Sequence, residues 1–243
     1  TRKVEISGYN YDRSKFEFNP QAKMPAIFQS FVPTLRTQFG GPDGFFFGNL
    51  RLDYKAELLL TKSLSIQAAV SQGIANNFDE LKLASDSVLP HVRTDIVQYL
   101  KQGTGLTVNY LQMDQFVKPS NNVYIKASAG LFESMFGGIG GEVLYRPFYS
   151  NWALGAELWK VKQRDYDQMF SFRDYETLTG HINFYYKEPR TQLLIMLKGG
   201  RFLAEDSGIH FDFSRRFKSG TRMGIFFAKT DISEFEFGEG SFD

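Results

Sequence analysis

Apolar and polar residues alternate along most of this chain with a period of two. In segment 49–58, one set of alternate positions is apolar: Leu50, Leu52, Tyr54, Ala56 and Leu58. The intervening positions are polar or charged: Asn49, Arg51, Asp53, Lys55 and Glu57. Successive side chains of a β-strand point to opposite faces, so the segment predicts a strand with one apolar and one charged face.

The same alternation predicts eleven strands from Ile27 onward. They are expected at 27–39, 49–58, 64–71, 106–116, 123–131, 140–148, 152–160, 181–187, 191–201, 209–216 and 222–230. Pro33 weakens the first of them, because proline cannot donate to a strand ladder. Residues 1–24 are a candidate for a short leading hairpin. The fold class predicted is therefore all-β, with about 11–12 antiparallel strands in this chain.

The connections between these strands differ systematically in length. Tight turns rich in Pro, Gly, Asn or Ser are predicted at 61–63, 118–121, 149–151, 187–190 and 218–220. Long connections are predicted at 75–103 and 165–177. Tight turns occupy every second connection, which places them all at one end of the sheet. Short turns at one end and long loops at the other are typical of transmembrane β-barrels, although a β-sandwich can show the same pattern by chance.

We therefore predict a single antiparallel transmembrane β-barrel domain over residues 1–243, with 75–103 as a long loop or plug-like insertion. A soluble barrel or sandwich with its apolar face inward explains the alternation equally well. Two features favour the membrane. The polar faces carry many charges and small residues, as a wet lumen would. The apolar faces end in aromatic residues, as an interfacial girdle would: Tyr54, Tyr110, Tyr145, Trp152 and Tyr186.

Composition narrows the function classes further. The 28 basic and 27 acidic residues give a net charge of +1, which argues against a nucleic-acid-binding protein. Cysteine is absent, which excludes disulfides and thiolate metal sites. No apolar run approaches the ~18 residues of a spanning helix, so any membrane insertion must use strands. The 25 Phe, 12 Tyr and 22 Gly residues favour an all-β fold.

Several local motifs resemble hallmarks of the YjbH family. They are FGGIGGEVLYRPF at 136–148, VKQRDYD at 161–167, FRDY at 172–175, TGH at 179–181 and FGEGSFD at 237–243. LPHVRTDI at 89–96 and GGPDG at 40–44 fit as well, and the motifs follow the order expected from about residue 40 to 243.

This resemblance implies an outer-membrane protein of Gram-negative bacteria, linked to exopolysaccharide or group 4 capsule production and export. It also implies outer-membrane lipid, polysaccharide and other exopolysaccharide-secretion proteins as partners, and no cofactor. Family members are longer and are similar to double-barrel proteins. An odd strand count leaves an unpaired edge, which is costly in lipid, so we expect this chain to be a fragment.

Charged residues on the polar faces and in the second long connection are the candidate site. We expect them to line a lumen and contact glycan or partner proteins without catalysing a reaction. The candidates are Arg51, Asp53, Lys55, Glu57, Glu142, Arg146, Arg164, Asp165, Arg173, Asp174, His181, His210, Asp212 and Arg216. Aromatic residues interleave with the charges of the 165–177 connection, which suits saccharide binding.

Two alternative functions remain open. His210, Asp212 and Ser214 share one strand face and suggest a barrel enzyme acting on lipid or glycan. Residues two apart on a strand lie ~6.5 Å apart, too far for a direct proton relay, so polar lumen lining is favoured. The other alternative is a soluble β-rich carbohydrate-binding module.

Two further motifs are interpreted as structural. His91 and Asp95 have the i, i+4 spacing of metal ligands, but no third ligand is evident and a bracing or plugging role is favoured. The glycines at 137–141 are not followed by Lys-Ser/Thr, so they are not a phosphate loop. We expect them to bend the strand or to let another backbone approach.

Overall fold

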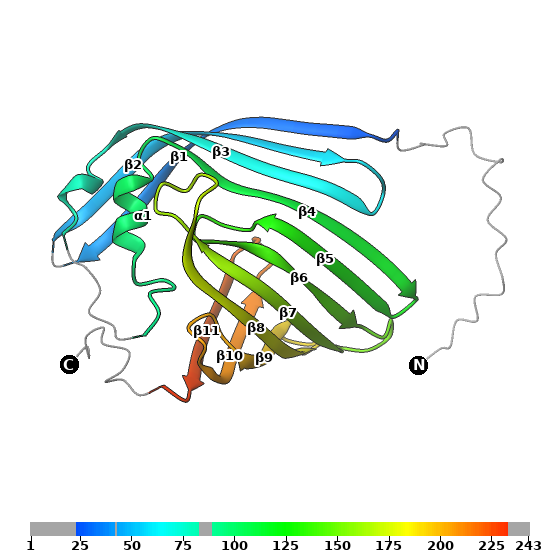
Figure 1. The fold of residues 1–243 in the computed structure, drawn as a ribbon. Coiled ribbons are helices and arrows are strands. Elements are labelled where there is room, and N and C mark those ends of the chain that lie inside the picture. The colour runs from blue at the N-terminus through cyan, green and yellow to red at the C-terminus, as the bar shows by residue number, and fades with distance from the viewer. Residues whose placement is uncertain (1–22, 42, 83–88, 233–243) are drawn as a thin grey trace.

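A computed structural model describes residues 23–41, 43–82 and 89–232. Its eleven strands form one antiparallel sheet in sequence order (Figure 1). They are β1 (Ala26–Gly41), β2 (Gly44–Leu59), β3 (Leu64–Asn76), β4 (Leu106–Ser120), β5 (Val123–Leu131), β6 (Phe136–Tyr145), β7 (Trp152–Arg164), β8 (Phe172–Lys187), β9 (Leu193–Arg201), β10 (Ser207–Arg216) and β11 (Arg222–Thr230). A 3-10 turn, η2 (Phe78–Glu80), and a short helix, α1 (Ile96–Gln102), lie between β3 and β4.

The predicted strands are confirmed in number, order and direction. The largest boundary error is at β8, which begins at Phe172 rather than at 181, so the second long connection shrinks to 165–171. β8 pairs with β7 in unbroken register back to Glu176, and after a register shift between Lys162 and Arg164 one further pair joins Arg164 to Phe172. The leading hairpin at 1–24 lies outside the described residues apart from Lys23 and Met24, and the 237–243 motif lies outside them entirely.

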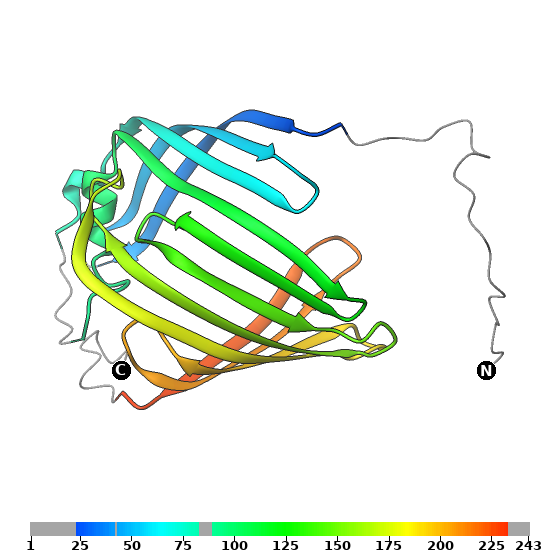
Figure 2. The same cartoon turned by 45° about the vertical axis from the view of Figure 1, so that its right-hand side comes forward.

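The two ends of the sheet differ as the loop lengths predict. One end carries the tight turns β2–β3, β4–β5, β6–β7, β8–β9 and β10–β11. The other end carries α1 and the 165–171 loop, which lie close together in both views (Figures 1 and 2). We call these the short-turn end and the loop end.

The sheet curves strongly (Figure 2). Its two faces differ in the polarity of their side chains. On β8, Thr177, Thr179 and His181 are buried on the concave side. The intervening Leu178 and Ile182 are 47% and 65% exposed on the convex side. The antiparallel register carries this alternation across the sheet. Exposed apolar residues of the convex side include Phe31, Leu52, Met113, Ile139, Leu158, Ile209 and Ile225.

The sheet is open within the described residues. Its edge strands β1 and β11 pair only with β2 and β10, and no described backbone pairing joins them to each other. The observed architecture is thus a curved, eleven-stranded antiparallel sheet whose polar side faces inward.

The helix α1 contributes to two separate buried clusters at the loop end. Leu100 joins a buried cluster with Phe47, Phe78 and Leu81, which ties the helix to β2 and η2. Tyr99 joins a second cluster with Met135, Phe136 and Val161 from the β5–β6 connection, β6 and β7. No helix among the described residues is long and apolar enough to cross a membrane.

Candidate functional site on the concave face

A hollow of about 820 Å³ lies between the concave side of the sheet and the segment leading into α1. The strands contribute polar and aromatic side chains, including Gln112, Lys126, Glu157, Trp159, Thr179, His181, Lys198 and His210. The segment before α1 contributes Leu89, Pro90, Val92, Arg93 and Thr94. The long insertion between β3 and β4 therefore forms one wall of this hollow.

Glu157 is the centre of a charged cluster in the hollow. Its Oε1 lies 2.7 Å from Nζ of Lys198 and 3.0 Å from Nδ1 of His181. Trp159 donates from Nε1 to the other carboxylate oxygen at 3.4 Å. Nε2 of His181 and Oδ1 of the neighbouring Asn183 are buried without a hydrogen-bond partner. Such atoms favour a polar ligand or water, because leaving them unpaired costs free energy.

A second hollow of about 670 Å³ continues toward the short-turn end. Lys126 lines both hollows and forms a 3.1 Å ion pair with Glu142. The second hollow is lined further by Tyr124, Arg146 and Tyr185. The two hollows therefore meet at Lys126 on the concave face.

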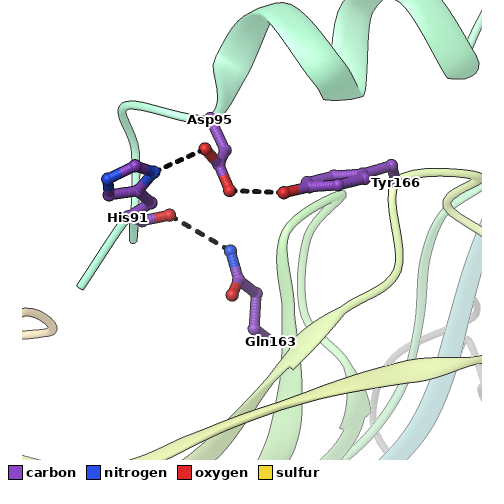
Figure 3. Close-up of polar contacts among 4 residues, drawn as sticks. All are labelled: His91, Asp95, Gln163 and Tyr166. Carbon is purple, nitrogen blue, oxygen red and sulfur yellow. Dashed lines mark hydrogen bonds and ion pairs between the residues drawn. The ribbon is translucent and has the colours of Figure 1, made fainter. Parts of the chain in front are cut away.

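A chain of hydrogen bonds at the loop end joins the segment before α1 to Gln163 of β7 and to the 165–171 loop (Figure 3). Nδ1 of His91 lies 2.8 Å from Oδ1 of Asp95, and Tyr166 donates to Oδ2 of the same carboxylate at 2.6 Å. Gln163 donates to the carbonyl oxygen of His91 at 3.1 Å. Burial, together with this hydrogen bond to Asp95, raises the pKa of Tyr166 to about 12. Among the described residues, no group of three or more His, Asp or Glu side chains is placed to hold a metal ion.

Comparison with known proteins identifies the family. The sequence model of the YjbH family, described as "Exopolysaccharide biosynthesis protein YbjH", matches residues 8–243. The chain belongs to the YjbH family. A relative from Escherichia coli (strain K12), named "Uncharacterized lipoprotein YjbH", is 36% identical over 242 residues. The alignment covers 97% of this chain and 33% of the relative, so the chain spans about a third of the relative's length.

The candidates on β2 are held by hydrogen bonds in this YjbH-family chain. Arg51 donates to Thr107 and, at 3.3 Å, to Asn109. Asp53 accepts from the hydroxyl of Ser71 at 2.5 Å. These bonds hold both side chains on the concave side, which favours a structural role for both charges, and Nε of Arg51 stays buried without a hydrogen-bond partner.

Lys55 and Glu57 lie farther along β2, where they line a smaller hollow together with Tyr110. The prediction that Tyr110 ends an apolar face is therefore wrong. A register shift between Ala69 and Val70 inserts an extra residue in β4 and turns Tyr110 to the concave side.

The candidates around the 165–171 loop are dispersed. Arg164 is buried and donates to the carbonyl oxygens of Glu133 at 2.6 Å and Met169 at 2.7 Å, so it braces the loop. Arg173 stacks on the Tyr166 ring at 4.1 Å, and Asp165 accepts from the Tyr166 backbone amide. Asp174 is exposed and shares the convex side with Leu178. These residues do not form one ligand-binding mouth.

The possible hydrolytic residues on β10 do not form a relay with one another. Arg222 donates to the hydroxyl of Ser214 at 2.8 Å and lies 3.6 Å from Asp212. His210 stacks on Phe226 at 5.7 Å and lines the first hollow. Arg216, at the end of the strand, is exposed.

The glycine run on β6 makes room for β7, as one of the two interpretations predicts. A Cβ on Gly138 would lie 2.1 Å from the carbonyl oxygen of Lys160. A Cβ on Gly140 would lie 2.3 Å from the indole of Trp159, which covers this position on the concave side. The strand pairs with β7 without a register shift, so no bulge is present here.

Three residues at the centre of the first hollow are not among the candidates that the sequence predicts. Glu157, Trp159 and Lys198 lie on strands whose alternation is interrupted by glycine or apolar residues on the polar face. Two of them can be identified from the strand register, which places each opposite a predicted candidate on a neighbouring strand. Glu157 pairs with the predicted candidate His181 across β7 and β8, and His210 pairs with Lys198 across β10 and β9.

Proposed function

We propose that this chain is part of an outer-membrane β-barrel that serves exopolysaccharide export as a non-catalytic component. In this proposal the convex side faces lipid, and the concave side contacts glycan or partner proteins. The single observation that supports it is that polar side chains are buried on the concave side while apolar side chains are exposed on the convex side, the reverse of a soluble protein. Buried polar residues such as Thr179 and His181 alternate with exposed apolar residues such as Leu178 and Ile182.

The free-energy cost of exposing apolar side chains to water favours lipid as the surroundings of the convex side. Soluble monomers rarely expose contiguous apolar patches larger than a few hundred Å². Here exposed apolar side chains recur on strands from β1 to β11, with Phe31 at 69% and Ile225 at 71% exposure. Transmembrane barrels carry such an outward apolar band around a polar interior.

The same proposal requires pairing partners for the two open edges of the sheet. Unpaired backbone groups of β1 and β11 are too costly in lipid, where no water satisfies them. We therefore propose that further strands, outside the described residues, pair with β1 and β11 and complete the barrel. The family description supports the assignment to exopolysaccharide, and the relative's name supports an envelope location.

The experiment is membrane fractionation of the full-length protein followed by gel mobility with and without boiling. We expect outer-membrane fractionation, a requirement for detergent, and a heat-modifiable band. A monodisperse protein that folds in buffer without detergent would contradict the proposal and favour the soluble carbohydrate-binding module. Normal polymer export in a strain lacking the protein would separately contradict the role in export.

A further inference from the structure

The two ends of the sheet carry opposite charge. The connections between strands at the short-turn end, 60–63, 121–122, 146–151, 188–192 and 217–221, contain four basic residues and one acidic residue, Glu188. The basic residues are Lys62, Arg146, Arg190 and Lys218, and three more, Lys118, Lys187 and Arg216, lie at or near the ends of the adjoining strands. The described connections at the loop end, 43, 77–82, 89–105, 132–135, 165–171 and 202–206, contain nine acidic and three basic residues. Such an asymmetry creates a field that attracts anions to the short-turn end.

Part of this positive charge faces the concave side. Arg146 and Lys187 line the second hollow, and Lys118 lies 5.4 Å over the ring of Tyr124, which lines it too. No described carboxylate lies within 4.0 Å of these three cations. By contrast, Lys126, deeper in the hollow, is paired with Glu142. The outermost cations of the hollow are therefore available to a ligand.

The second hollow also holds the other groups that bind sugars. Tyr124 and Tyr185 present aromatic rings, and Asn151 and Asn183 present amides. Aromatic faces pack against sugar rings, while Arg and Lys form charge-assisted hydrogen bonds with carboxylates. Because Lys126 lines both hollows, a chain bound here continues toward Trp159 and His181.

We propose that the short-turn end binds a polysaccharide bearing carboxylate groups, through Arg146 and Lys187 at the mouth of the second hollow. This inference rests on the proposed function and adds the charge class of the glycan and the end at which it is bound. A lipid surface is the weaker candidate, because these cations line the concave hollow whereas lipid would meet the convex side.

The test uses the full-length protein in detergent, with a short oligogalacturonate as the probe and a neutral maltodextrin of similar length as the comparison. We expect the oligogalacturonate to bind more tightly, with an affinity that falls as salt rises. The double variant Arg146→Gln/Lys187→Gln should weaken this binding about tenfold or more. The matched variant Lys62→Gln/Arg190→Gln removes the same charge from exposed turns and should leave the binding within about twofold.

Three results would overturn the inference. The first is equal binding of both saccharides, and the second is an equal loss in both double variants. The third is Arg146-dependent binding to phosphatidylglycerol nanodiscs without oligogalacturonate binding. Heat-modifiable mobility is measured on the same samples. A heat-modifiable protein that binds no oligogalacturonate overturns this inference alone, whereas folding without detergent overturns the proposed function and this inference with it.

Discussion

The phenol of Tyr166 donates a 2.6 Å hydrogen bond to the carboxylate of Asp95, which lies 71 residues earlier in the chain. The bond joins the 165–171 loop to the segment that enters α1 (Figure 3). A second bond reinforces it, because Tyr99 of α1 donates to the carbonyl oxygen of Arg164 at 2.5 Å. The two connections therefore form one layer over the loop end of the concave face.

Replacing Tyr166 by Phe should loosen this layer without unfolding the sheet. Loss of a hydrogen bond to a charged group lowers the free energy of local opening by about 1.5–3 kcal/mol. Hydrogen exchange of the α1 amides in the full-length protein measures that opening directly. Tyr149→Phe is the matched control, because Tyr149 is 95% exposed in a tight turn and should leave exchange unchanged. Unchanged exchange in both variants would contradict a bracing role for Tyr166.

Alkaline pH should release the same layer. The pKa of Tyr166 is raised to about 12 in the folded protein, against about 10 for an unfolded tyrosine. A raised pKa means that the contribution to stability is complete below pH ~10 and is lost as pH rises toward ~12. Protease cleavage within 89–105 should therefore stay constant from neutral pH to about 10 and then increase. The phenolate absorbance that Tyr166→Phe removes should titrate near pH 12, and titration near 10 would contradict the assignment.

The membrane proposal predicts that the two sides of β8 tolerate charge differently. Ile182→Lys places an ammonium on the convex side and should cost about 2–4 kcal/mol of folding free energy in lipid vesicles. Thr179→Lys, on the same strand, points into the first hollow and should cost less. Urea titration of the heat-modifiable band measures both. Equal costs would contradict a lipid-facing convex side.

Alternation alone predicts the strands and their order because a half-buried strand must separate its apolar and polar residues. It does not predict where pairing stops. The extension of β8 follows its continued pairing with β7, and the inward turn of Tyr110 follows a register shift between β3 and β4, so both depend on two strands at once. The open edges at β1 and β11 likewise depend on pairing partners and not on the pattern within either strand.

The candidate site is predictable only in part for a similar reason. His181 and Glu142 stand out as polar residues on alternating strands, and both line the hollows. Arg164 stands out equally, yet its guanidinium is occupied by backbone carbonyls of neighbouring loops. Charge identifies residues that need a partner, but only the fold decides whether that partner is a carbonyl, a carboxylate or a ligand.

Glu157 and Lys198 should be coupled more strongly than an exposed ion pair. Their side chains are 15% and 28% exposed and meet at 2.7 Å. A double-mutant cycle with Glu157→Gln and Lys198→Gln should give a coupling free energy of about 1–3 kcal/mol. The comparison pair is Arg201 and Glu205 at the loop end, which meet at 3.1 Å with 45% and 45% exposure and should give less than about 1 kcal/mol. A coupling no larger than that of the exposed pair would contradict a charged cluster at the centre of the hollow.

A side chain at Gly140 should clash with the indole of Trp159, so this position should accept only glycine. A methyl group at Gly140 would lie 2.3 Å from the indole, so Gly140→Ala must displace the ring or distort β6. Overpacking of this kind costs about 1–3 kcal/mol, and it should shift Trp159 fluorescence. Gly105→Ala is the control, because no atom lies within 4 Å of its added Cβ. Unaltered stability and fluorescence in Gly140→Ala would show that Trp159 does not lie across β6, and the wall that it provides for the first hollow would have to be reassigned.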